Sequence, residues 1–132
     1  MAPHQKDFKK WSVQKEGLHT EKGRPFFDVG EIWFCALGAN IGFEQDGMGE
    51  KFLRPSIIIR KFNNEVLWVV PLTKNQKTGP YYFQFSFEEG IVSSAIISQM
   101  RLLDAKRLMY LKGNMKKEDF EKLKEKIRNL LV

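Results

Sequence analysis

Residues 56–72 read SIIIRKFNNEVLWVVPL. Two apolar runs, 56–62 and 65–72, have the length and the β-branched content typical of strands. Between them lie Asn63 and Asn64, and asparagine tolerates the positive φ angles of a tight turn. Pro71 is expected at the end of the second strand, where a missing backbone donor costs little. The segment therefore predicts an antiparallel hairpin.

Strand-like segments continue on both sides of this hairpin. They are EIWFCAL at 31–37, YYFQFSF at 81–87, VSSAIIS at 92–98 and LMYLK at 108–112, the last preceded by a short helical turn at 104–107. Short strands at hairpin spacing, with helices at the chain ends, predict a mainly β fold, a small and partly open barrel with helices packed outside. A five-stranded sheet with one helical layer would give almost the same pattern.

Both ends of the sequence have helical periodicity. Residues 5–22 predict an amphipathic helix with Phe8, Trp11, Leu18 and the stem of Lys15 on one stripe, ended by Gly23–Arg24–Pro25. From Lys116 onward, Phe120, Leu123, Ile127 and Leu130 recur on one face of a second helix, with Asn114 as its expected N-cap. The sequence thus divides into an N-terminal helical extension, 1–28, and a single domain, 29–132.

The loop between the first strand and the hairpin is long. Residues 38–53, GANIGFEQDGMGEKFL, contain four glycines and few apolar anchors. A loop of this length in a small domain is uncommon unless it is functional. We expect it to be mobile in the free protein and to border the binding site.

Composition restricts the class of protein. A chain of 132 residues with a net charge of +6 favours one domain with a polyanionic partner. Cys35 is the single cysteine, so an intrachain disulfide is excluded, and its apolar surroundings predict a core thiol. The charged N-terminus does not resemble a signal peptide, and no apolar run approaches the ~18 residues of a membrane span. A cytoplasmic protein is expected.

The inventory of reactive side chains excludes several mechanisms. Both histidines, His4 and His19, fall in the N-terminal extension, which argues against a two-histidine ribonuclease or a Ser-His-Asp site. Zinc-ligand spacing and a phosphate-binding glycine loop are both missing, so neither a metal nor a cofactor is expected. Any catalysis must use Arg, Lys, Glu, Asp, Thr, Gln or Tyr.

Several short motifs in the order found here resemble the MazF/PemK/Kid endoribonuclease toxins of type II toxin–antitoxin systems. They are Gly30–Glu31–Ile32–Trp33, Gly42–Phe43–Glu44–Gln45, Arg54–Pro55, Pro71–Leu72–Thr73, Ser98 to Asp104 (SQMRLLD) and Lys106–Arg107–Leu108. Each motif alone is weak, but together they span about residues 29–131 in the right order.

The resemblance implies an SH3-like barrel of the CcdB/PemK type that works as a homodimer. It also implies metal-independent, ribosome-independent cleavage of single-stranded RNA at a short sequence, leaving 2′,3′-cyclic phosphate and 5′-hydroxyl ends. An acidic antitoxin would cover the RNA groove, and operator DNA would be contacted only through that antitoxin.

The resemblance also implies site residues. The family's key arginine and threonine fall on Arg54 and Thr73, and its loop Glu/Gln pair falls on Glu44 and Gln45. A guanidinium can hydrogen-bond two oxygens of a pentacoordinate phosphorane, and a threonine hydroxyl can donate to a third. Glu44 either accepts the 2′-hydroxyl proton or positions Arg54. Further RNA contacts are expected from Gln45, Phe43, Gln99, Arg101 and Lys74.

This chain departs from the family pattern in three places. DGMGEKFL, residues 46–53, is longer than the corresponding segment of many members, Phe43 replaces a small polar residue of some members, and the helix at 5–22 is additional. Phe43 either stacks on a nucleobase or packs against protein. Two other functions stay open: a non-catalytic binding module of the same fold, and a gyrase-directed toxin like CcdB, which uses an apolar C-terminal end resembling 127–132.

Overall fold

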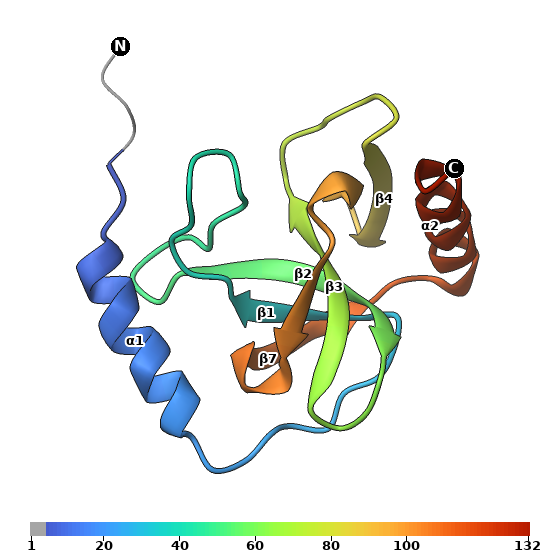
Figure 1. Ribbon diagram of the computed structural model, residues 1–132. Helices are drawn as coiled ribbons and strands as arrows, with labels where there is room; N and C mark the ends of the chain where they lie inside the picture. The colour runs from blue at the N-terminus through green and yellow to red at the C-terminus, as the bar shows by residue number, and fades with distance from the viewer. Residues whose placement is uncertain (1–4) are drawn as a thin grey trace.

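The computed structural model describes residues 5–132, which form seven strands and two helices (Figure 1). In chain order they are α1 (Phe8–Thr20), β1 (Glu31–Ala36), β2 (Leu53–Lys61), β3 (Val66–Thr73), β4 (Tyr82–Glu88), β5 (Ile91–Ile96), β6 (Arg101–Asp104), β7 (Leu108–Asn114) and α2 (Lys117–Leu130). Two 3-10 turns, η1 (Ile97–Gln99) and η2 (Ala105–Arg107), flank β6. The predicted mainly β fold with a helix near each end is confirmed.

Strands β2 and β3 form the predicted hairpin, with Ile57 opposite Val70 and Lys61 opposite Leu67. The Asn63 side chain stabilises the turn, because its Oδ1 accepts from the backbone N–H groups of Glu65 and Val66 at 2.7 and 2.9 Å. Asparagine is favoured in turns for this kind of local bond.

Pro71 lies inside β3 and not at its end, so that prediction is wrong. The reason is that β3 changes partner along its length. Val66 to Val69 pair with β6, whereas Leu72 and Thr73 pair with β5. Pro71 falls between the two partners, at a position that pairs with Ser56 of β2 but with neither β5 nor β6.

The sheet is antiparallel and open. Its strand order is β4-β5-β3-β2-β1-β7, with β6 beside β3. Because η2 joins β6 directly to β7, the strands β7, β1, β2, β3 and β6 follow one another in the arrangement of a small barrel that does not close. The seven strands, with α1 and α2 at opposite sides of the sheet (Figure 1), exclude the five-stranded sheet with one helical layer.

Apolar side chains form a core on each face of the sheet. One cluster includes Cys35, Leu67, Val69 and Leu103, and the other joins the sheet to α2 through Leu123 and Ile127. Cys35 is fully buried as predicted, and burial raises the pKa of its thiol to about 12. A thiol with this pKa is protonated and unreactive near neutral pH.

The two helices differ from expectation at their ends and in their packing. α1 begins after the N-cap Asp7 and buries Trp11, and Leu18 packs partly buried against the same cluster. Phe8 is half exposed and Lys15 is exposed, so the predicted stripe is wrong at these two residues. α2 begins after Lys116, because β7 continues to Asn114, which pairs with Glu31 and cannot also cap the helix.

Candidate functional site

A cavity of about 790 Å³ is lined by residues of β1, β2 and β7 and by residues of the β4–β5 hairpin. The end of the long β1–β2 loop forms one wall, and the last residues of β3 form another. Its lining includes three predicted site residues, Arg54, Thr73 and Lys74. It also includes an aromatic and basic group that the sequence did not indicate: Phe34, Phe87, Tyr110 and Lys112.

Arg54 is held rigidly in the wall of this cavity. Only 9% of the residue is exposed. Its Nε donates to the backbone carbonyl of Asp46 at 2.6 Å, and its Nη1 donates to that of Leu72 at 3.2 Å. The side chain therefore borders the cavity and is at the same time nearly buried.

Burial lowers the pKa of the Arg54 guanidinium from its usual value, and the nearby Asp46 carboxylate acts in the opposite direction. The ordinary pKa of arginine is so high that the group stays charged at neutral pH. A charge with little competing water interacts more strongly with an incoming anion than an exposed charge does.

Gln45 adds a third contact to Arg54. With its amide oxygen facing the guanidinium, that oxygen accepts from Nη2 at 2.8 Å and from Nε at 3.1 Å. A guanidinium carries five N–H donors. These internal bonds therefore leave a donor on each terminal nitrogen for a bound anion, while the plane of the group stays fixed.

Thr73 ends β3 beside the same cavity. Its Oγ1 accepts from the backbone N–H of Asn75 at 3.2 Å, which is a turn-stabilising contact. A hydroxyl has one donor and two acceptor positions. The contact uses an acceptor position, so the Thr73 proton is available to a phosphate oxygen. Lys74 follows at once and is exposed.

The structure does not bring Glu44 together with Arg54 and Thr73. Glu44 is exposed, and its Oε1 accepts from the backbone N–H of Ile41 at 3.0 Å. Among residues 5–132, the carboxylates that line the cavity are Glu50 and Glu88. Glu88 forms an ion pair with Lys112 at 3.0 Å, whereas Glu50 lies exposed near the end of the loop.

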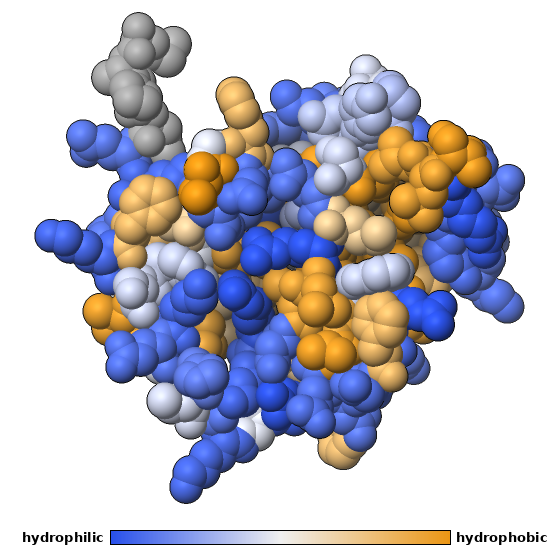
Figure 2. All heavy atoms as spheres, viewed as in Figure 1, coloured by the Kyte–Doolittle hydropathy of each residue, from blue (hydrophilic) through white to orange (hydrophobic). Residues whose placement is uncertain are grey.

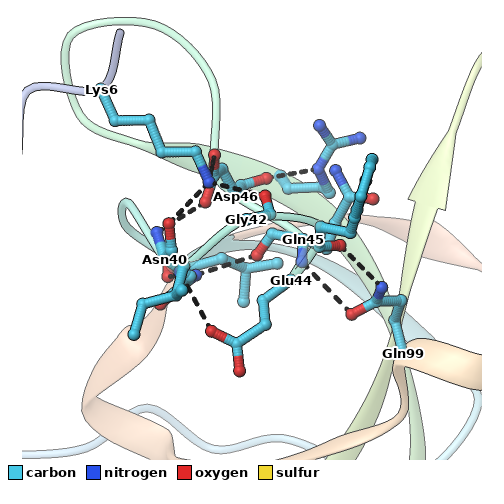
Figure 3. A network of polar contacts seen from close by, with 11 residues as sticks. Lys6, Asn40, Gly42, Glu44, Gln45, Asp46 and Gln99 are labelled. Carbon is cyan, nitrogen blue, oxygen red and sulfur yellow. Dashed lines mark hydrogen bonds and ion pairs between the residues drawn. The ribbon is translucent and has the colours of Figure 1, made fainter. Parts of the chain in front are cut away.

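Gln99 fastens the loop to η1 from one side (Figure 3). Its Nε2 donates to the Phe43 carbonyl at 3.0 Å, and its Oε1 accepts from the Gln45 N–H at 3.2 Å. The Phe43 ring itself is almost fully exposed. Arg101 lies on β6 and is not among the described residues that line the cavity.

The β1–β2 loop has more anchors than its glycine content suggested. Asn40 Nδ2 donates to the carbonyls of Leu37 and Gln45 at 3.0 and 2.9 Å, and Gly47 N–H donates to Gly38 at 2.8 Å. The bonds join residues within the loop and between the loop and its neighbours, so they could not be inferred from composition. The mobility of the loop in solution stays a prediction.

An aromatic pair forms part of the cavity wall. Phe34 and Tyr110 face each other across the β1–β7 pairing, with ring centroids 4.6 Å apart and an interplanar angle of 29°. Lys112 Nζ lies 4.9 Å from the centre of the Phe34 ring. About half of Tyr110 is exposed. The sequence carried no signal for this pair, because it depends on which strand lies next to β1.

Among the residues that the structure describes, the remaining titratable side chains form no metal-binding cluster. Within residues 5–132, no group of three or more His, Cys, Asp and Glu side chains is placed to hold a metal ion. His19 is exposed in the last turn of α1, and His4 falls outside the described residues. In this same range, no helix is both long and apolar enough to cross a membrane.

Comparison with known proteins identifies the family. Residues 28–131 match the model of the PemK-like, MazF-like toxins of type II toxin–antitoxin systems. The chain belongs to this family. The resemblance carried by the short motifs is thereby confirmed, and the family match begins after α1.

Solved structures of other members of this toxin family share the fold. The form I crystal structure of MazF from Deinococcus radiodurans superposes with a TM-score of 0.64 at 18% identity, covering 83% of this chain and 98% of that one. Toxin MazF-mt6 from Mycobacterium tuberculosis gives 0.59 at 14% identity, covering 76% and 95%. A mycobacterial endoribonuclease in complex with its cognate antitoxin gives 0.59 at 15%, covering 78% and 92%. The sequence matches none of the curated proteins.

Proposed function

We propose that this toxin is an endoribonuclease that cuts single-stranded RNA without a metal ion and without the ribosome. The observation that carries the proposal is the joint placement of Arg54, Thr73 and Lys74 at one cavity, with Arg54 fixed by bonds to two backbone carbonyls. Solved relatives that are endoribonucleases, one of them bound to its antitoxin, support the same function.

In the proposed reaction, the 2′-hydroxyl oxygen attacks the adjacent phosphorus and the bond to the 5′-oxygen breaks. The departing 5′-oxygen takes a proton from water, and the products are a 2′,3′-cyclic phosphate and a 5′-hydroxyl. The free donors of Arg54 bind the negative charge that develops on the non-bridging oxygens, and the Thr73 hydroxyl donates to one of them. Because these groups are positioned before the substrate arrives, they do not have to reorganise during the reaction.

Two carboxylates are candidates for accepting the 2′-hydroxyl proton. Glu44 would have to release the Ile41 amide and turn toward the cavity, whereas Glu50 already lines it. The contact of Glu44 with Ile41 fits better with its other predicted role, in which it stabilises the turn before Gln45 and so positions Arg54.

We place one nucleobase of the substrate against Tyr110. The exposed half of this ring borders the cavity that holds Arg54, and its other face rests on Phe34. Lys51, Lys74 and Lys112 also line the cavity, which suits the flanking phosphates. Aromatic platforms beside basic side chains are typical of single-strand binding. Phe43, Gln45, Gln99 and Arg101 would then act on the loop side, at the edge of the RNA path.

Tyr110→Ala should weaken binding of a non-cleavable single-stranded oligonucleotide by ~10-fold, since base stacking on an aromatic ring is worth about 1–3 kcal/mol. Tyr110→Trp should keep the affinity within about threefold, because the stacking surface is retained. The matched control is Tyr81→Ala, which removes a similarly exposed tyrosine that is not part of the cavity lining. Equal affinities for wild type and Tyr110→Ala in fluorescence anisotropy would contradict the placement of a nucleobase against Tyr110.

The proposed partners are an acidic antitoxin and a second copy of the chain. The cavity presents Arg54 and several lysines, so an acidic segment would compete with RNA for the same charges. Figure 2 shows hydrophobic side chains gathered over the middle of the sheet and again beside α2. The exposed apolar residues include Trp68 and Leu102, which pair across β3 and β6, and Phe62, which follows β2 and has its ring centroid 4.9 Å from that of Trp68. An apolar surface of this kind supports the proposed homodimer.

The experiment that tests the proposed function is incubation of the purified chain with a long single-stranded RNA in excess EDTA. Discrete cuts are expected, and intact RNA would contradict the proposal. In a separate assay with DNA gyrase and plasmid DNA, gyrase-linked DNA breaks would instead indicate the CcdB-like activity. The structure favours that activity less, because Ile127 is buried against the sheet, which leaves Leu131 and Val132 as the exposed apolar residues at the end of α2.

A further inference from the structure

The segment that precedes α1 reaches the β1–β2 loop at the point where the loop holds Arg54. The family match starts at residue 28, so this segment is an addition of the present chain to the toxin domain. In Figure 3, the Lys6 side chain extends across to the loop from the side opposite to Gln99. The two side chains hold the loop between them.

Lys6 is saturated by its contacts with the loop. Its ammonium donates to the carbonyl of Asn40 at 2.6 Å and to that of Gly42 at 3.0 Å, and it forms an ion pair with Asp46 Oδ2 at 2.9 Å. An ammonium group has three donors, and all three are used here. The side chain is 13% exposed, which is unusual for a lysine near the start of a chain.

Asp46 connects this lysine to Arg54. Its carboxylate accepts from Lys6 through Oδ2 and from the Asn40 N–H through Oδ1, the latter at 2.6 Å. Its own backbone carbonyl accepts from Arg54 Nε at 2.6 Å. Both ends of Asp46 are therefore fixed, and a displacement of its side chain would carry the carbonyl that orients the guanidinium.

Helix α1 adds two anchors that keep Lys6 in place. The Trp11 ring packs against Phe52 with centroids 5.5 Å apart, and it lies so close to Gly38 that a Cβ there would be 2.0 Å from the indole. Gln14 Nε2 donates to the Lys51 carbonyl at 2.6 Å. The helix is thus attached to the beginning and the end of the same loop.

We propose that Lys6 is a positioning residue for Arg54, acting through Asp46, so that the N-terminal extension presets the geometry of the RNA-cleaving site. The effect of Lys6 on the rate of RNA cleavage rests on the proposed function, whereas its effect on the orientation of Arg54 does not. Preset geometry matters because a misplacement of about 1 Å can cost on the order of 100-fold in rate.

The structural test measures the exchange of the Arg54 Nε–H proton with water by NMR. Lys6→Met and Lys9→Met each remove one positive charge, and Lys9 is an exposed lysine of α1 that takes no part in the loop contacts described above. We expect Lys6→Met to accelerate exchange of Arg54 Nε–H at least ~10-fold, while Lys9→Met leaves it near the wild-type rate. An unchanged exchange rate in Lys6→Met, or the same change in both variants, overturns the proposal.

The kinetic test compares the same two variants on a short RNA substrate. Lys6→Met should lower kcat ~10-fold and leave KM within about twofold of wild type, because the orientation of Arg54 is disturbed. Lys9→Met removes the same charge and therefore controls for the weaker electrostatic attraction of RNA. A rise in KM without a fall in kcat would mean that Lys6 binds RNA directly, which contradicts a positioning role. Should the wild-type protein cut no RNA, the proposed function fails, and the exchange measurement still decides the role of Lys6.

Discussion

Arg54→Ala is expected to lower the rate of RNA cleavage by ~10²–10³-fold, the loss typical of removing one preorganised donor to a developing oxyanion. The size of the effect follows from the position of Arg54, which is charged, nearly buried and held by Asp46 and Leu72. A water molecule that replaced the guanidinium would supply neither the charge nor the fixed orientation. Single-turnover rates on one RNA measure this loss directly.

The same substitution also affects stability, because it removes the donors from two backbone carbonyls. We expect unfolding to become easier by about 1–3 kcal/mol, so rates must be measured where the variant is folded. Arg54→Lys keeps the charge but loses the planar fork, and it should recover only part of the rate. Arg60→Ala, an exposed position on the same strand, is the charge-matched control. Folded Arg54→Ala with activity within threefold of wild type would remove Arg54 from the mechanism.

Gly47→Ala is expected to disrupt the β1–β2 loop and, with it, cleavage. A Cβ at this position would lie 1.6 Å from the Phe52 carbonyl oxygen, and backbone atoms cannot move aside as a side chain can. Gly47 follows Asp46, so a shift of the Gly47 backbone that relieves the clash would displace the carbonyl that holds Arg54. We expect a destabilisation of about 3 kcal/mol together with loss of activity.

Urea unfolding followed by tryptophan fluorescence measures the first effect of Gly47→Ala. Gly23→Ala is the control, because no other heavy atom lies within 4 Å of a Cβ at Gly23. Coincident unfolding midpoints for Gly47→Ala and wild type would mean that the loop accommodates the extra carbon. That result would contradict the expected destabilisation and the expected effect on Arg54.

Periodicity in the sequence was sufficient to predict the elements that depend on residues close together in the chain. The β2–β3 hairpin and the apolar face of α2 follow from runs of residues that are close together in the chain. The interior position of Pro71 could not be predicted, because it depends on β3 exchanging β6 for β5. The cap of α2 was misplaced for the same reason, since Asn114 is used by its pairing with β1.

The candidate site was predictable only where short motifs resemble the family. Arg54 and Thr73 were proposed from these motifs, and the structure places both of them at one cavity together with Lys74. The Phe34–Tyr110 pair was not, because its two members are brought together by the β1–β7 register. The role of Lys6 could not be predicted either, because its ion pair is with Asp46, 40 residues later in the sequence.

Attack by the 2′-hydroxyl is tested with two RNA oligonucleotides that differ at a single atom. One is a sequence that the protein cuts, and the other carries 2′-deoxy at the nucleotide before the scissile phosphate. In EDTA we expect cleavage of the first, with 2′,3′-cyclic phosphate and 5′-hydroxyl ends identified by mass spectrometry, and no detectable cleavage of the second. Cleavage of the deoxy substrate at a comparable rate, or activity that appears only with added Mg²⁺, would contradict this expectation.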